Sequence, residues 1–175
     1  TVPDGLADAV GIGAGGSHSL AVKSDGTVLG WGLNNFGQAT TPPGLSNVIA
    51  LAGGSLHSLA LKKDGTVVAW GDNSSGQTTV PAGLSGVIAV AAGGSRSLAL
   101  KSDRTVVAWG AGSPVSPPDP WGSNRGQATV PPDATNVIAI SAYYMNSMAL
   151  RSDGTVVAWG DNWQGQTNVP PGLSN

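Results

Sequence analysis

Short hydrophobic runs alternate with polar turns along the chain, and the same order of runs recurs four times. One unit, residues 48–86, reads VIALAGGSLHSLALKKDGTVVAWGDNSSGQTTVPAGLSG. Its VIALA run is apolar, SLALK alternates between polar and apolar positions, and TVVAW is rich in β-branched residues. Each run is typical of a short β-strand. The phrase VVAWG marks the four units through Trp31 (as VLGWG), Trp70, Trp109 and Trp159, at separations of 39, 39 and 50 residues.

Asp–Gly pairs separate the second and third runs of three units, at residues 25–26, 64–65 and 153–154. This dipeptide between two strands predicts a β-hairpin with a type I′ turn, in which both turn residues have positive φ. The third unit has Asp103 and Arg104 instead. Arg104 is therefore predicted to be left-handed, at a cost of about 1 kcal/mol. After the tryptophan, a polar loop leads into TTVP, whose proline restricts that segment to the edge of a sheet.

The repetition predicts an all-β fold, a β-propeller built of four-stranded antiparallel blades. One blade cannot bury both of its faces, so successive blades stack and share a continuous core. A β-sandwich of similar strands is the alternative, but a sandwich gives no reason for a fixed sequence period. The single domain, 1–175, is divided into a partial repeat at 1–9 and repeats at approximately 10–47, 48–86, 87–136 and 137–175. The third repeat carries an 11-residue insertion near 111–121.

Four repeats raise the question of how the ring is completed. The front TVPDGLADA and the rear TNVPPGLSN are copies of one segment, although a closed four-bladed ring has only one place for it. We therefore expect a partial propeller, an excerpt of a longer protein, as the first interpretation. The second is a homodimer in which another copy of the chain completes an eight-bladed ring.

Charge and composition narrow the range of ligands. Charged residues make up 10% of the chain and the net charge is −2, without a basic stripe to neutralise phosphates, so nucleic acid is not expected as a partner. No apolar run approaches the ~20 residues of a membrane span. With two histidines, no cysteine and no glutamate, no metal site is predicted, and DNSSG and DNWQG lack the final bidentate acid of a calcium loop. No cofactor is expected either, because the GIGAGG stretch precedes a strand and a dinucleotide motif needs a helix.

The phrase HSLALKKDGTVVAWGDNSSGQ (residues 57–77) resembles the blade signature of the RCC1 (regulator of chromosome condensation) superfamily. The longer phrase VVAWGDNSSGQTTVP…GVIAVAAGG is similar to the propeller-type β-lactamase inhibitory proteins and their bacterial relatives. The resemblance covers nearly the whole chain. It implies a propeller that usually has seven blades, a secreted or cell-surface location in a bacterium, and a role for His18 and His57 in holding neighbouring blades.

Aromatic residues fall into a group that repeats and a group that does not. The four tryptophans of the WG phrase recur at one position, which is typical of structural residues. Outside the repeat lie Phe36, Trp121, Tyr143, Tyr144 and Trp163, with Met145 beside the tyrosines. Strand directions place their loops, GGS and DNxxGQ, on one face and the Asp–Gly turns on the other. We therefore expect all five aromatics on one loop face, either as a contact patch or, for the tyrosines, as filling beside the insertion.

These observations favour a non-catalytic module that binds another protein through the loop face, as an inhibitor or adaptor does. The resemblance also implies, by position, that Tyr144, Met145, Phe36 and Trp163 fall among the partner-contacting residues of the inhibitors. A glycan-binding or cell-surface module and a purely structural repeat of a larger extracellular protein are the alternatives. No enzyme is predicted, because the histidine of the Ser17–His18 pair is not kept: the same position holds His57, Arg96 and Asn146 in the other units.

Overall fold

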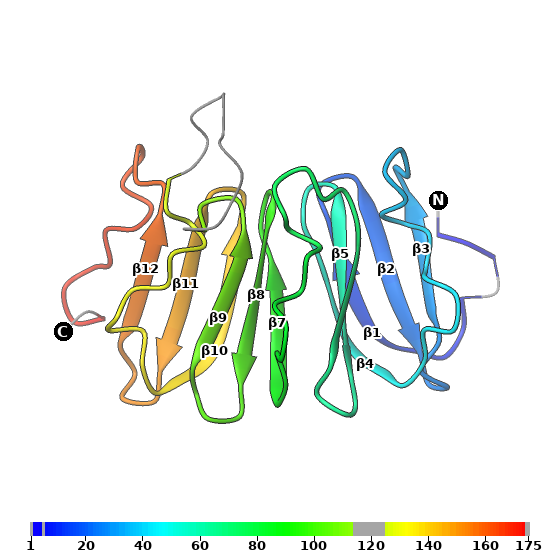
Figure 1. The fold of residues 1–175 in the computed structure, drawn as a ribbon, viewed down its shortest axis with the longest axis horizontal. Helices are drawn as coiled ribbons and strands as arrows, with labels where there is room; N and C mark the ends of the chain where they lie inside the picture. Colours follow the sequence, from blue (N-terminus) through cyan, green and yellow to red (C-terminus); the bar gives the residue numbers. More distant parts are fainter. Residues whose placement is uncertain (1, 5, 114–124, 174–175) are drawn as a thin grey trace.

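Twelve β-strands form the regular structure of the described residues, and they make four three-stranded antiparallel sheets (Figure 1). The structure is a computed structural model that describes residues 2–4, 6–113 and 125–173. We refer to the sheets as blades one to four in chain order. Their strands are β1 (Ala9–Ala14), β2 (His18–Lys23), β3 (Val28–Gly32), β4 (Val48–Gly53), β5 (His57–Lys62), β6 (Val67–Gly71), β7 (Val87–Ala92), β8 (Arg96–Lys101), β9 (Val106–Gly110), β10 (Val137–Tyr143), β11 (Asn146–Arg151) and β12 (Val156–Gly160).

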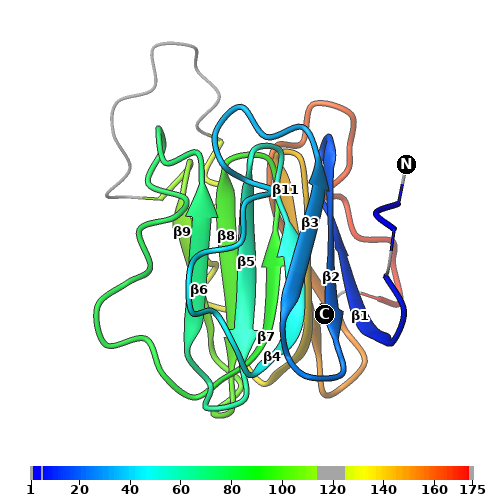
Figure 2. The ribbon, with the colours of Figure 1, turned by 90° about the vertical axis from the view of Figure 1, so that its right-hand side faces the viewer.

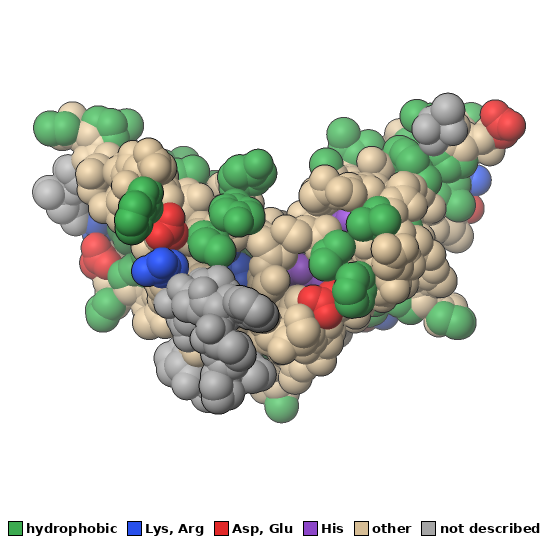
Figure 3. All heavy atoms as spheres, turned by 90° about the horizontal axis from the view of Figure 1, so that it is seen from above, with side chains coloured by type: hydrophobic (Ala, Val, Ile, Leu, Met, Phe, Trp, Pro, Cys, Tyr) green, Lys and Arg blue, Asp and Glu red, His purple; other side chains and the backbone are tan. Residues whose placement is uncertain are grey.

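The blades stand side by side in an open arc. Within each blade the strands follow chain order, and the first strands, β1, β4, β7 and β10, contact one another from blade to blade. Seen from above, the molecule is a crescent whose two ends lie apart (Figure 3). The prediction of an all-β, propeller-type arrangement of four repeats is confirmed, and the described residues form an arc rather than a closed ring.

Each blade has three strands, so the prediction of four-stranded blades is wrong. The expected fourth strand of blade one, in the segment 39–43, forms no ladder with the strand before it. In blade one, Pro42 and Pro43 have no N–H to donate to a neighbouring strand. A side chain takes over part of this role, since the Thr41 hydroxyl donates to the Val28 carbonyl at 3.0 Å.

The hairpin turns also differ from the predicted type I′ form. Only the second turn residue has positive φ, 79° at Gly65 and 66° at Arg104. The Gly65 N–H donates to the Lys62 carbonyl, and the Lys62 N–H donates to the Thr66 carbonyl, both at 2.9 Å. This is a type I turn closed by a left-handed residue. Asp64 selects it by accepting bonds from the Thr66 N–H (3.0 Å) and hydroxyl (2.6 Å). The left-handed conformation predicted for Arg104 is confirmed.

The hydrophobic core lies between blades rather than within them. At the junction of blades two and three, Leu59 and Leu61 from β5 pack with Ala99 and Trp109 of the next blade. All four are buried. Equivalent clusters fill the other two junctions. The alternating pattern of the second strand is thus a pattern of two buried faces, one turned to each neighbouring blade.

A set of buried hydrogen bonds crosses the same junction. Trp109 Nε1 (2.9 Å) and Ser97 Oγ (2.8 Å) both donate to the Gln77 carbonyl of the preceding blade. His57 Nε2 lies 3.1 Å from Ser97 Oγ, and because the serine proton is already engaged, His57 is the donor. Corresponding bonds run from Trp70 and Ser58 to Gln38, and from Trp159 and Ser147 to Gln127.

Candidate binding surface on the loop rim

Two sets of loops gather at one edge of the arc, which we call the loop rim. One set joins the first and second strands of each blade, and the other follows the third strand. The Asp–Gly turns and their Asp–Arg counterpart occupy the opposite edge, the turn rim, as both side views show (Figure 1 and Figure 2). This arrangement follows from the antiparallel order of the strands, as the sequence predicted.

The loops after the third strands are braced by their own polar side chains. In blade two, Asn73 Oδ1 accepts from the Thr78 N–H (2.9 Å), and Gln77 Oε1 accepts from the Ser75 N–H (2.8 Å). Asp72 Oδ2 accepts from Gln77 Nε2 at 2.7 Å. Blade four repeats these bonds through Asn162, Gln166 and Asp161. The loops therefore present rigid tips, and no group of three or more His, Asp, Glu or Cys that could hold a metal ion occurs in the described ranges.

The non-repeated aromatics of the described residues all lie on this braced rim and are exposed. Their exposed fractions are 52% for Phe36, 80% for Tyr143, 63% for Tyr144 and 81% for Trp163. Met145 is half-buried. Trp121 lies outside the described residues. Figure 3 looks onto the loop rim, where hydrophobic side chains are spread along the crescent.

A paired exchange explains why blade four alone has a tyrosine at this end of its first strand. Tyr143 occupies the position of Gly54 in blade two, and Asn146 occupies that of His57. A Cβ added to Gly54 would collide with the His57 ring and lie 2.5 Å from the oxygen of Gly93 in the next blade. The shorter Asn146 removes the ring, and no further blade covers blade four among the described residues. The tyrosine is therefore tolerated only where both constraints are absent.

Tyr144 is held in an unusual backbone conformation by blade three. Its φ is 46°, which is rare for a bulky side chain and costs on the order of 1 kcal/mol. Its carbonyl accepts bonds from Arg96 Nη1 (2.6 Å) and the Gly94 N–H (2.7 Å). Arg96 also donates from Nε to Ser147 Oγ (2.8 Å) and from Nη2 to the Asn146 carbonyl. The guanidinium, fully buried, thus fixes the loop that carries both tyrosines.

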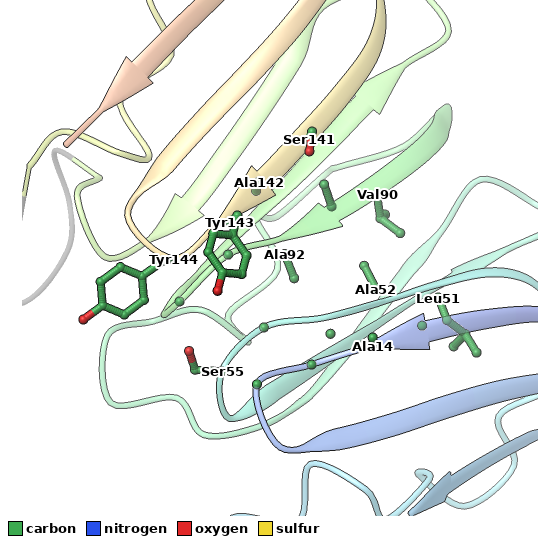
Figure 4. A pocket seen from close by; sticks show the side chains of 18 of the residues that line it. Ala14, Leu51, Ala52, Ser55, Val90, Ala92, Ser141, Ala142, Tyr143 and Tyr144 are labelled. Atoms are coloured by element: carbon green, nitrogen blue, oxygen red, sulfur yellow. The ribbon is translucent and has the colours of Figure 1, made fainter. Parts of the chain in front are cut away.

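The concave side of the arc is hollowed next to these tyrosines. The hollow measures about 610 Å³ and is lined by the ends of β1, β4, β7 and β10, mostly by glycine and alanine. In Figure 4 the Tyr143 ring lies beside the small side chains, whereas the Tyr144 ring points away from them. The small lining residues leave Tyr143 free of contacts that would bury it.

The buried ionisable groups lie at the blade junctions and link neighbouring blades. Burial lowers the pKa of His57 to about 4 and the pKa of Arg96 to about 10, so His57 is neutral and Arg96 charged near pH 7. Burial also lowers the pKa of His18, whose Nε2 lies 2.9 Å from Ser58 Oγ. Each of these side chains ties one blade to the serine of the next, which is a structural arrangement.

Sequence reasoning missed two features of this surface. The role of Arg96 as the clamp of the tyrosine loop was not predicted, although it occupies the histidine position of the repeat. The recurring Gly-Gln pair was not recognised as the brace of each loop and the acceptor of the next blade. Position in the repeat was the signal for both features. Arg96 replaces the histidine of the repeat, the Gly-Gln pair recurs in the repeat, and both lie beside variable loops.

The fold and this surface define a repeat protein of the propeller class whose loops vary while the tryptophan and serine bonds of its blade junctions recur. The Regulator of chromosome condensation (RCC1) repeat matches the chain at residues 9–38, 48–77, 87–113 and 137–166. The chain therefore belongs to the RCC1 repeat family. No curated protein matches it significantly. The described part contains no helix long and apolar enough to cross a membrane.

Three solved structures with the same fold are about twice as long as this chain. Human WBSCR16 is 20% identical with a TM-score of 0.73, and the match covers 95% of this chain and 52% of that one. Prp20p from Saccharomyces cerevisiae, in a study of its binding to Gsp1p and histones, is 25% identical with a TM-score of 0.72 over 93% and 46%. Yeast RCC1 (Prp20) bound to Kap60 is 21% identical with a TM-score of 0.70 over 94% and 46%. The chain thus spans about half the length of these proteins.

Proposed function

We propose that this chain is a protein-binding module that engages its partner through the loop rim, as an adaptor or inhibitor. The observation that carries the proposal is the placement of Phe36, Tyr143, Tyr144 and Trp163, exposed by 52–81% on braced loops. Large aromatic side chains on a rigid scaffold give buried contact area at a low entropic cost, which is how binding hot spots are built.

Two further observations support a macromolecular partner of modest charge. The loop rim carries few ionic groups, and Arg125 and Asp161 lie close to each other there at 3.8 Å, so long-range attraction contributes little. The described aromatics are concentrated in blades one and four and are not repeated once per blade, as a sugar site in every blade would require. Neighbours of this fold bind proteins: Prp20 is described with Kap60, Gsp1p and histones.

The identity of the partner is a narrower question. The resemblance to the propeller-type β-lactamase inhibitors suggests one candidate, a β-lactamase, because it implies that Tyr144, Phe36 and Trp163 share positions with the contact residues of the inhibitors. Blade two differs from that pattern, since Ser55, Leu56, Ser74 and Ser75 offer small or aliphatic side chains. A class of partner other than β-lactamases is therefore included in the test below.

Blade two supplies the matched variant for the test. Replacing each exposed aromatic by its blade-two counterpart gives Phe36→Ser, Tyr143→Gly, Tyr144→Ser and Trp163→Ser. A turn-rim variant, Lys63→Ser, alters an exposed residue on the opposite edge and serves as the control. Proteins captured from an extract of the source organism by the wild type are identified by mass spectrometry. Each is then purified and titrated against the three forms, together with a panel of β-lactamases and a glycan array.

A partner that binds the wild type and the turn-rim control equally, and the four-residue variant at least ~30-fold more weakly, supports the proposal; one hot-spot side chain alone is worth about 2 kcal/mol. Circular dichroism establishes that all three forms are folded. Equal binding of every partner to the variant would overturn the proposal and leave a structural repeat. Binding of a glycan but of no protein would replace it with the glycan-binding alternative.

A further inference from the structure

The three junctions within the arc use one set of complementary faces. The rear face of each blade offers two leucine or valine side chains of its second strand and a glutamine carbonyl. The front face of the next blade offers a tryptophan, a serine and an apolar residue of its first strand. In the junction of blades one and two, Leu20 and Val22 meet Leu51 and Trp70, and Trp70 Nε1 reaches the Gln38 carbonyl at 2.9 Å.

The front face of blade one has the same elements without a partner among the described residues. Ile12 takes the position of Leu51 but is 80% exposed, compared with 9% for Leu51. Leu29 is 37% exposed beside it. Trp31 and Ser19 occupy the positions of the junction tryptophan and serine, and both are only half-buried. This face therefore presents two donors and an apolar surface with the geometry of an internal junction.

The rear face of blade four is the matching half. Met148 and Leu150 take the positions of the buried Leu59 and Leu61, yet they are 39% and 36% exposed. Gln166 is exposed, whereas its counterpart Gln77 is 1% exposed because the next blade covers it. The rear face thus offers an apolar surface and a carbonyl acceptor, which complement the apolar surface and the two donors of the front face of blade one.

We infer that the two end faces bind each other between two copies of the chain, front face to rear face, so that two arcs close one ring. Extended exposed apolar faces mark interaction sites, and a heterologous contact of this kind forms a closed ring only if the curvature allows it. Figure 3 shows one copy as an open crescent whose two ends lie apart. Two copies of the chain together have about the length of WBSCR16 or Prp20.

Tyr143 gives the junction between copies a distinguishing feature. At an internal junction the equivalent Gly54 comes so close to the next blade that an added Cβ would lie 2.5 Å from the Gly93 oxygen. In the closed ring, Tyr143 faces Gly15 of the second copy, the counterpart of Gly93. The junction between copies is therefore wider at the loop rim than the three internal ones, so that Tyr143 stays exposed on the rim.

Analytical ultracentrifugation of the full chain across micromolar concentrations tests the inference. Ile12→Asp places a charge on the front face, and Met148→Asp places one on the rear face. Ile49→Asp is the matched control, because Ile49 is 55% exposed but lies on neither end face. We expect a dimer for the wild type and the control, and a monomer for each end-face variant, since either substitution damages both junctions of the ring.

Mixing the two end-face variants separates this ring from other dimers. In a front-to-rear ring the mixed dimer keeps one undamaged junction, so mixing restores part of the dimer. In a front-to-front or rear-to-rear dimer one of the two substitutions has no effect, and that result would overturn the inference. A wild type that stays monomeric at 100 times the concentration used for binding assays would also overturn it, whether or not the loop rim binds a partner.

Discussion

Blades two and four are built from the same repeat, yet they differ where they meet their surroundings. Both place a tryptophan and a serine on the carbonyl of the preceding glutamine, with bonds of 2.8–3.0 Å. At the loop rim, blade two has Gly54 and His57 where blade four has Tyr143 and Asn146. The tryptophan and serine that the two blades share lie against the preceding blade. The residues in which they differ lie on the side where the next blade would stand.

This contrast shows what limits variation in a repeat protein. A residue is fixed when a neighbouring blade imposes a hydrogen bond or a close backbone approach on it. Blade two is enclosed on both sides and keeps a glycine, whereas the rear face of blade four is open among the described residues and accepts an aromatic. At this position the aromatic is thus permitted by the loss of a packing constraint, before any partner is involved.

The largest expected effect on stability concerns the tryptophan of the blade junctions, which all four blades share. Trp70→Ala removes a buried side chain and its bond to the Gln38 carbonyl, so we expect a loss of about 3–5 kcal/mol in the free energy of unfolding. Trp31→Ala should cost about 1 kcal/mol, because Trp31 is half-buried and its Nε1 has no partner among the described residues. Urea denaturation, followed by circular dichroism at concentrations where the chain is monomeric, measures both. Equal losses would contradict the difference between an enclosed and an open blade.

The next largest effect is a pH dependence of stability that His57 of blade two should cause and that Asn146, its counterpart in blade four, cannot. His57 is fully buried, and its pKa is lowered to about 4 from the ordinary 6.5. The unfolded chain therefore binds more protons than the folded one between these values. Stability should be fully present above pH 6.5 and fall by about 3 kcal/mol as the pH drops to 4. Urea denaturation at a series of pH values measures this slope.

His57→Asn is the matched control, because Asn146 fills this position in blade four. The variant should lose the His57 contribution and keep that of His18, whose pKa burial also lowers. The turn carboxylates Asp64 and Asp103, whose pKa values are lowered from 3.8 to about 2, also lose stability below about pH 5. They are the same in both forms, so the difference between the two slopes reports His57. An unchanged slope in His57→Asn would assign the pH dependence to other groups.

The sequence was sufficient to predict the repeat, the strand order and the common rim of the variable loops, because these follow from a fixed period and from antiparallel alternation. It was insufficient for the fourth strand, where Pro42 and Pro43 remove the donors of a ladder. It also failed at the turns, where the bonds of Asp64 to Thr66 select a type I turn that the Asp–Gly pair alone does not specify.

Only those features of the candidate site that are visible in the sequence itself could be predicted. Tyr143 and Trp163 were singled out because they break the repeat, and a break is visible in the letters alone. The clamp from Arg96 to the Tyr144 carbonyl was not visible, because it joins two blades through a main-chain atom. The relation between Tyr143 and Asn146 required the distance from Gly54 to the next blade, which depends on how the blades stack.

The smallest expected effects on stability test whether the next blade and His57 keep a glycine at position 54. Gly54→Ala should cost about 1–3 kcal/mol, because its Cβ meets the His57 ring and the Gly93 oxygen. Adding His57→Asn removes the first contact and leaves the second, so the double variant should recover only part of the loss. Tyr143→Gly in blade four should change the free energy of unfolding by no more than about 0.5 kcal/mol, since Tyr143 is 80% exposed. If Gly54→Ala were as mild as Tyr143→Gly in urea denaturation, the next blade would not be what keeps glycine at this position.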